Sequence, residues 1–323
     1  FSDAWTVTLG GRYYDYDLKL ESAATFPPFP PTGPQFTFRP AGQKDSGFLG
    51  KINAAYRISS DVLAYGTISQ GYRGGSSNAL NPCPVPLTPT TFFCGQPNEL
   101  LYTPDTTTNY EIGFKTQWLD GRVTFNPSIF YIDWEDIQLG SSTQVGAVGI
   151  TVNGEGATSQ GAEISLDAKI TEKLTVQGNL AYTDAQLSER SPGLIRTIVP
   201  PGFRGVYVDG EAGDRLPGSA KHQGGISLSY VEPITSRFDL EFGWRTSFSG
   251  DVLSTAGARG GSLTLPSYSL SHARIGLTNA ESQWSVTLYA DNIFNKFVEV
   301  STRGTSLFNQ NVADAFGNPV YDR

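Results

Sequence analysis

Few residues in this sequence could carry out acid–base or nucleophilic chemistry. It contains two histidines, His222 and His272, and a hydrolase would need one of them beside a nucleophile and an orienting acid. Ser271 precedes His272, but adjacent side chains of a strand point to opposite faces. We therefore interpret His272 as a hydrogen-bonded histidine that shares the polar face of a strand with Arg274. We expect no catalytic residue, no cofactor and no enzyme activity.

Cations and aromatic residues instead gather in segments rich in Pro, Gly, Ser and Thr. Arg forms bidentate contacts with anionic groups, and cations also bind the faces of aromatic rings, so such segments suit anionic or aromatic solutes. The candidate ligand-binding residues in these segments are Arg73, Phe92, Phe93, Arg196, Phe203, Arg204 and Tyr207. His272 and Arg274 are further candidates, on the polar, lumen-facing side of a strand. Packing within its own loop is the competing, and more frequent, role of each residue.

The two cysteines, Cys83 and Cys94, flank a Pro- and Thr-rich segment. A zinc site would need further ligands, and neither histidine is close in sequence. Two unrelated buried thiols are the alternative to a disulfide. We predict a disulfide that ties one loop, which implies an oxidising compartment. Acidic clusters such as Asp209, Glu211 and Asp214 are interpreted as solvated loop ends, so we predict no metal site.

The segment 109–137 indicates which elements position these residues. Apolar and polar residues alternate in it on both sides of Asp120-Gly121, a strong signal for a two-residue hairpin turn. One face of the hairpin collects Tyr110, Ile112, Phe114, Trp118, Val123, Phe125, Ile129 and Tyr131. The apolar strand is longer than the roughly five or six residues usual in soluble proteins. With aromatic residues at both ends, it fits a tilted strand that crosses a membrane, so we predict that this face contacts lipid.

The same pattern recurs along the chain. Alternating runs lie at 4–20, 48–56, 62–72, 162–170, 174–182, 223–230, 237–248, 268–278 and 283–291. Short turns and long connections separate them in strict alternation, which is the layout of an outer-membrane barrel with long extracellular loops. We predict an all-β fold, a transmembrane antiparallel β-barrel of which about eleven strands are present. Pro127 cannot donate a ladder hydrogen bond, so we expect a bulge there.

Composition agrees with this interpretation. No run of about eighteen apolar residues exists, so a transmembrane helix is excluded. A net charge of −8 without basic clusters argues against nucleic acid as a partner. The sequence has no Met at all, so we expect it to begin inside a longer protein. Eleven strands would leave two unpaired edges in lipid, so further strands are expected before residue 1, after residue 323, or both.

Several segments in this order resemble TonB-dependent receptors of Gram-negative bacteria. They are "YTPDTTTNYEIGFKTQWLDGRVTFNPSIFYIDWEDIQL", "VNGEGATSQGAEISL", "YSLSHARIGL…WSVTLYADNIFNK" and "FGNPVYDR". The resemblance covers nearly the whole chain. Each motif is weak alone, but their order and spacing are specific.

This resemblance implies a 22-stranded barrel filled by an N-terminal plug, with a segment ahead of the plug that binds TonB. Residues 1–323 would be a partial barrel domain, with no plug domain and no last strand in this chain. The implied function is TonB-coupled uptake of a large scarce solute, with a ferric siderophore expected, through the cell outer membrane. The implied partners are the TonB complex, the solute and outer-membrane lipid. A barrel hydrolase and a passive porin are the alternatives.

Overall fold

The computed structural model describes residues 4–22, 39–87, 94–145, 148–198, 205–259, 263–279 and 284–299. Its main element is an antiparallel sheet that contains eleven of the described strands. In spatial order these are β1 (Trp5–Ser22), β2 (Arg39–Arg57), β3 (Val62–Arg73), β6 (Asp105–Trp118), β7 (Val123–Glu135), β10 (Gly156–Lys169), β11 (Leu174–Leu187), β14 (His222–Pro233), β15 (Phe238–Ser249), β18 (Tyr268–Asn279) and β19 (Ser285–Ala290). The predicted all-β class and the predicted number of strands are confirmed.

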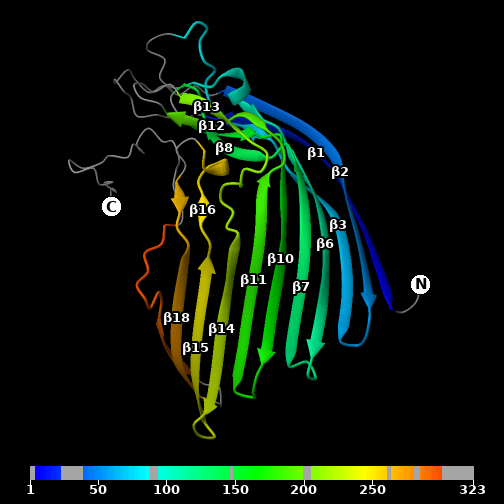
Figure 1. Cartoon of the computed structure of the whole chain (residues 1–323), viewed down its shortest axis with the longest axis vertical. Coiled ribbons are helices and arrows are strands. Elements are labelled where there is room, and N and C mark those ends of the chain that lie inside the picture. Colours follow the sequence, from blue (N-terminus) through cyan, green and yellow to red (C-terminus); the bar gives the residue numbers. More distant parts are fainter. Residues whose placement is uncertain are drawn as a thin grey trace, which may run out of the picture.

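The sheet curves into an open trough (Figure 1). Short turns join β2 to β3, β6 to β7, β10 to β11 and β14 to β15 at one end, and the longer connections gather at the other. We call these the turn end and the loop end. Strands β1 and β19 form the two edges of the described sheet and do not pair with each other. The barrel is therefore not closed within the described part of the chain.

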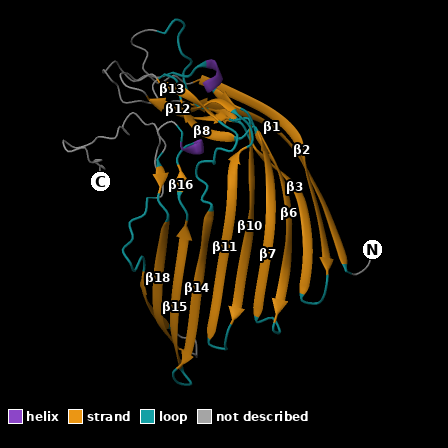
Figure 2. Ribbon diagram, in the orientation of Figure 1, coloured by secondary structure: helices purple, strands orange, loops and turns teal. Residues whose placement is uncertain are grey.

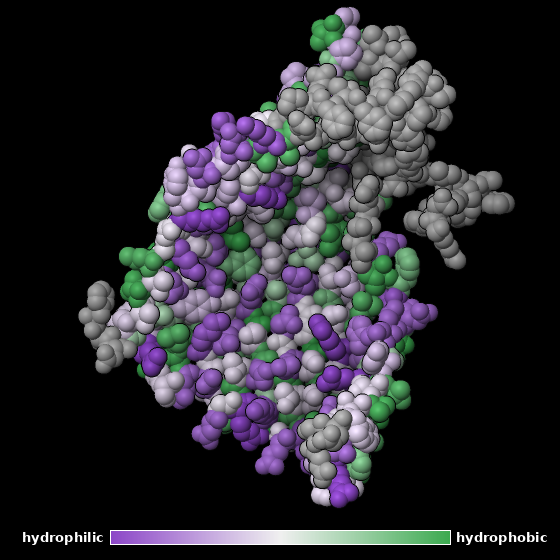
Figure 3. All heavy atoms as spheres, turned by 180° about the vertical axis from the view of Figure 1, so that it is seen from behind, coloured by the Kyte–Doolittle hydropathy of each residue, from purple (hydrophilic) through white to green (hydrophobic). Residues whose placement is uncertain are grey.

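The two faces of the sheet differ in chemistry, as alternation predicts. The convex, outward face carries large apolar side chains that are strongly exposed, such as Ile112 and Ile129, both 59% exposed. The concave, inner face carries charged and amide side chains, and Figure 3 shows hydrophilic residues across this face. Among the described residues, no helix is long and apolar enough to span a membrane.

The hairpin of β6 and β7 has the predicted register. Tyr110 pairs with Tyr131, and Trp118 pairs with Val123. Leu119, Asp120 and Gly121 have φ values of 54°, 58° and 79°, and the Arg122 amide donates to the Leu119 carbonyl oxygen at 3.1 Å. This tight turn aligns the apolar residues of both strands on the outward face.

The bulge expected at Pro127 is absent. The register is the same on both sides of Pro127, where Gly113 pairs with Ser128 and Gln117 pairs with Thr124. Only the strand pairs between these two positions are missing. The Asn126 side-chain oxygen accepts a hydrogen bond from the Thr116 amide at 3.0 Å. A side chain thus replaces a lost ladder bond, so the strand needs no extra residue.

The register of the last hairpin differs from our expectation. The alternating runs 268–278 and 283–291 imply a turn at residues 279–282, which would place His272 opposite Tyr289. In the structure the Asn279 amide donates to the Trp284 carbonyl oxygen at 3.1 Å, and Arg274 rather than His272 pairs with Tyr289. Moving a four-residue connection by one position shifts the pairing by two residues. Because the shift is even, each side chain keeps its face.

We expect Asn126→Ala to destabilise the protein, because the Thr116 amide would lose its acceptor in a part of the ladder that Pro127 has already weakened. A buried unsatisfied donor costs about 1–3 kcal/mol. The measurement is the free energy of unfolding of the full-length protein in lipid vesicles. The control is Asn179→Ala, which removes an exposed amide from the same face of β11. Equal losses in both variants would contradict this role of Asn126.

Candidate functional site

The connections at the loop end fold into a layer of small sheets (Figure 2). The described pairs are β4 (Ser76–Ser77) with β5 (Leu101–Tyr102), β8 (Gln138–Ser142) with β9 (Gly149–Asn153), β12 (Ser191–Ile198) with β13 (Gly205–Gly210), and β16 (Val252–Leu253) with β17 (Thr264–Leu265). Two 3₁₀ turns, η1 (Pro97–Glu99) and η2 (Ala256–Ala258), complete this loop layer. Segments expected to be irregular therefore hold ordered strands.

A compact apolar cluster anchors the loop layer to the sheet. It joins the loop ends of β10 and β11 to β12 and η2. Its buried members are Ile137, Ala157, Ala185, Leu187, Leu194, Ile195, Leu216 and Ala256. Buried apolar area is a main source of stability, so this cluster makes the layer a packed body rather than a set of independent loops.

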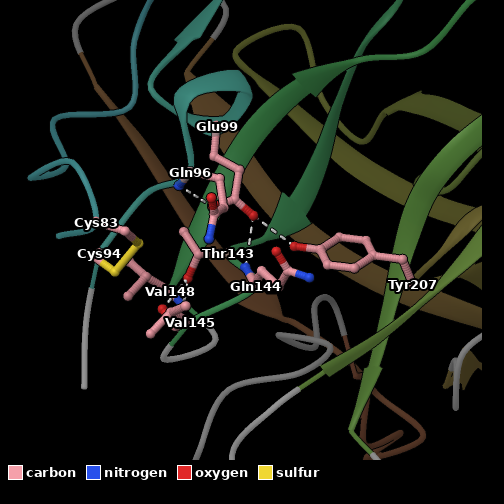
Figure 4. The surroundings of a disulfide bond; sticks show 9 residues. All are labelled: Cys83, Cys94, Gln96, Glu99, Thr143, Gln144, Val145, Val148 and Tyr207. Atoms are coloured by element: carbon pink, nitrogen blue, oxygen red, sulfur yellow. Dashed lines mark hydrogen bonds between the residues drawn. A yellow bond between two sulfur atoms is a disulfide. The ribbon is translucent and has the colours of Figure 1, made fainter. Parts of the chain in front are cut away.

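A buried carboxylate links three of these connections (Figure 4). Glu99 is only 5% exposed, and it accepts hydrogen bonds from the Gln96 amide, the Gln144 amide and the Tyr207 hydroxyl, each at 2.7 Å. The disulfide between Cys83 and Cys94 lies beside this site. Hydrogen bonds to a charged acceptor are stronger than neutral ones, so Glu99 holds the β5, β8 and β13 segments together.

A second buried carboxylate holds Arg73. Asp105, 2% exposed, pairs with the Arg73 guanidinium and accepts a hydrogen bond from the Gln138 amide at 3.0 Å. The guanidinium also donates to the Gln138 carbonyl oxygen at 3.1 Å and lies 5.5 Å from the centre of the Trp134 ring. Arg73 therefore supports the junction between the sheet and the loop layer.

Two further acids form charged contacts within the layer. The Gly193 amide and the Arg190 guanidinium hold the pKa of Asp209 below its ordinary value. Burial works to raise the pKa of Asp214, but hydrogen bonds from Arg259 and the Glu211 amide outweigh it, so this pKa is also lowered. Such contacts contribute stability above the ordinary carboxyl pKa of about 4 and lose it as the pH falls through the lower folded values.

The inner face forms a hollow of about 1010 Å³ over β6, β7, β10, β11, β14 and β15. Acids and bases both line it, among them Glu111, Lys115, Glu163, Asp167 and Arg245. A smaller hollow of about 450 Å³ lies in the loop layer, where Tyr207 and Glu99 meet amide side chains such as Gln144. The inner-face hollow is mainly polar and suits a hydrated solute. The smaller hollow combines polar groups with apolar side chains such as Ile150 and Val152.

His272 and Arg274 lie on the inner face of β18, as predicted. The His272 ring nitrogen Nδ1 is 2.8 Å from Oδ1 of Asp291. Ser271 lies on the opposite face, 4% exposed, with its hydroxyl 2.9 Å from that of Thr246. A base and an orienting acid are thus present, but Ser271 cannot serve them as a nucleophile.

The structure brings only some of the predicted ligand contacts together. Arg73 lies at the junction of the sheet and the loop layer and Tyr207 lies within the layer, and each already holds neighbouring segments in place. The backbone of Arg196 pairs with Tyr207. Phe92, Phe93, Phe203 and Arg204 lie outside the described residues. Ligand contact by any of these residues stays a prediction.

Our sequence interpretation missed the two buried acids, Glu99 and Asp105. We expected β6 to begin near Tyr110, so Asp105 was counted within a loop. A signal did exist, since Arg73 and Asp105 end neighbouring strands and pair across them. Among the described residues, no cluster of three or more His, Cys, Asp or Glu side chains could hold a metal ion.

A curved antiparallel sheet with an apolar outward face, a polar inner face and a packed loop layer at one end defines the class of large membrane β-barrels. Residues 1–293 match the family model described as TonB dependent receptor-like, beta-barrel. The chain belongs to the TonB-dependent receptor family. This is a family of receptors, which agrees with the prediction that the chain is not an enzyme.

Several solved structures share this fold. The ferric yersiniabactin uptake receptor FyuA from Yersinia pestis is 18% identical with a TM-score of 0.67, over 94% of this chain and 40% of that one. The siderophore receptor PiuA from Acinetobacter baumannii is 15% identical with a TM-score of 0.62, over 91% and 37%. The ferripyoverdine receptor of the outer membrane of Pseudomonas aeruginosa is 16% identical with a TM-score of 0.56, over 93% and 34%. The chain therefore spans well under half the length of these proteins.

We expect Glu99→Gln to loosen the loop layer without unfolding the sheet, because an amide offers one acceptor oxygen where the carboxylate offers two. Hydrogen–deuterium exchange of the full-length protein should rise in β8, β9 and β13, while β10 and β11 stay protected. The control is Glu189→Gln, since Glu189 is an exposed acid of the same layer. Unchanged exchange in β13 would contradict the proposed linking role of Glu99.

Proposed function

We propose that this chain is part of an outer-membrane receptor that takes up a large, scarce solute by TonB-coupled active transport, with a ferric siderophore as the solute. The observation that carries this proposal is the family match over residues 1–293. The names of the similar solved structures support the choice of solute, because they describe uptake of ferric yersiniabactin and binding of ferripyoverdine.

Lipid contact is proposed for the outward face of the β6–β7 hairpin. The face comprises Tyr110, Ile112, Phe114, Trp118, Val123, Phe125, Ile129 and Tyr131, of which all but the half-buried Val123 are exposed. Exposed apolar side chains on a continuous surface are costly in water and favourable in hydrocarbon. The outward face therefore fits the acyl chains of the outer membrane, with the loop layer on the extracellular side.

The inner face supports passage of a hydrated solute. Its charges are organised by contacts such as that of the Tyr65 hydroxyl, which donates to Glu111 at 2.6 Å, and that of the Gln177 amide, which donates to Asp167 at 2.6 Å. Polar groups with fixed orientation are suited to a water-filled lumen or to a domain that packs within it. Transport of this kind makes and breaks no covalent bond.

The two alternative functions have less support. A barrel hydrolase would need a nucleophile beside His272, and Ser271 lies on the other face. A passive porin would share the two faces of the sheet, but it would not require TonB. Dependence of uptake on the energised inner membrane separates a porin from the proposed receptor.

We expect an arginine substitution to destabilise the protein much more on the outward face of β10 than on its inner face. Ile164 lies on the outward face and Ser165 on the inner face, and both are exposed. A charge that faces the middle of the bilayer costs about 2–4 kcal/mol, whereas positions in the lumen tolerate it. Ile164→Arg should therefore lower the free energy of unfolding from lipid vesicles much more than Ser165→Arg. Equal costs would count against lipid contact by this face.

The function is tested with the full-length protein and a panel of ferric siderophores. We expect tight binding of at least one ferric complex, and radiolabelled iron uptake that stops when the proton-motive force is collapsed. Arg274→Gln, which removes an inner-face cation, should weaken binding about ten-fold, the effect of a lost charged hydrogen bond of ~1.4 kcal/mol. Arg57→Gln at the turn end is the control.

Two results would contradict the proposal. Failure to bind any ferric chelate would exclude the assignment to iron uptake. Uptake that continues without the proton-motive force would indicate a passive pore.

A further inference from the structure

A further hollow lies at the loop ends of β14, β15 and β18. Its volume is about 490 Å³. The lining includes His222, Phe248, Ser267, Tyr268, Ser269 and Lys296. It shares Phe248, Ser249 and Tyr268 with the edge of the inner-face hollow. His222 and Lys296 do not line the inner-face hollow, and no role described above uses them.

Strand alternation places His222 and Phe248 on the outward face. His222 begins β14 two residues before Gly224, and that outward row continues with Ile226 and Leu228, which are exposed apolar residues. The His222 ring lies 5.2 Å from the ring of Tyr182, another exposed outward residue. The hollow therefore lies between this apolar surface and the loop layer.

Lys296 reaches the hollow through the turn that follows β19. The Ile293 amide donates to the Ser271 carbonyl oxygen at 2.9 Å, which continues the pairing along β18. The Phe294 ring then lies 6.2 Å from the outward ring of Trp244. The Asn292 side chain bonds both backbone groups of Lys296 at 2.9 Å. This turn fixes the backbone of Lys296 beside the hollow.

The chemistry of the lining favours an anion. Lys296 supplies a positive charge, and no ion pair to it is found in the described part of the chain. His222 and the serine hydroxyls add hydrogen-bond donors. Asp184, which lies two residues nearer the loop end than Tyr182, is already paired with Lys221 at 2.9 Å. The positive charge of Lys296 is therefore available for a ligand.

We propose that this hollow binds the phosphate group of a membrane lipid. A lysine, a histidine and hydroxyl groups together match the charge and the acceptor oxygens of a phosphate. The acyl chains of the lipid would lie along the apolar row of Ile226 and Leu228 and beside Trp244, so headgroup and tail both find complementary surfaces. This inference rests on the proposed lipid contact of the outward face.

The test uses full-length protein in detergent, with phosphatidic acid as the probe and native mass spectrometry as the readout. Wild-type protein should retain phosphatidic acid in preference to diacylglycerol. The double variant His222→Gln/Lys296→Gln should lower that retention about ten-fold. Lys19→Gln is the matched control, because Lys19 is also an exposed lysine near the loop end but belongs to β1.

Three results would overturn the proposal. They are equal retention by the double variant and the wild type, equal loss in Lys19→Gln, and complete displacement of the lipid by an equal concentration of inorganic phosphate, which would identify a free-anion site. Quenching of tryptophan fluorescence by a bromine-tailed neutral lipid reports acyl contact with the outward face separately. Retained quenching with no headgroup selectivity would reject this site alone, whereas absent quenching would reject the lipid contact on which it rests.

Discussion

The pairing of backbone amide and carbonyl groups between antiparallel strands is the constraint on which the rest of this structure depends. An unpaired polar group in hydrocarbon costs several kcal/mol, so a strand that crosses a membrane must keep its ladder intact. Once the ladder is set, alternation assigns every side chain to one of two faces. Even at Pro127 the register persists, because the Asn126 side chain replaces the missing bond.

The loop layer obeys a different rule. Its strands are short, and its stability comes from an apolar cluster and from the buried carboxylates of Glu99 and Asp105. Each carboxylate joins segments that are distant in sequence, and the disulfide adds a covalent link. Residues that resemble ligand contacts by type, such as Arg73 and Tyr207, are already part of this framework.

The regular part of the fold was predictable from local signals. Alternation and the Asp120-Gly121 turn were sufficient for the register of β6 with β7, because a tight turn at a known position leaves one way to pair the two alternating runs. The register of β18 with β19 was not predicted correctly, since no Gly or Asn pair specifies the turn after Asn279. The loop-layer sheets could not be foreseen, because their pairing depends on long-range contacts such as that between Tyr207 and Glu99. For the same reason residue type alone did not separate framework from candidate site.

The central claim is that the sheet has one face in lipid and one in water. Spin labels placed one at a time at positions 162 to 168 of β10, in the full-length protein within its membrane, test it most directly. The account predicts that collision rates with oxygen peak at even positions and those with a polar nickel chelate peak at odd positions, with a period of two residues. Equal access of both reagents at neighbouring positions would contradict it.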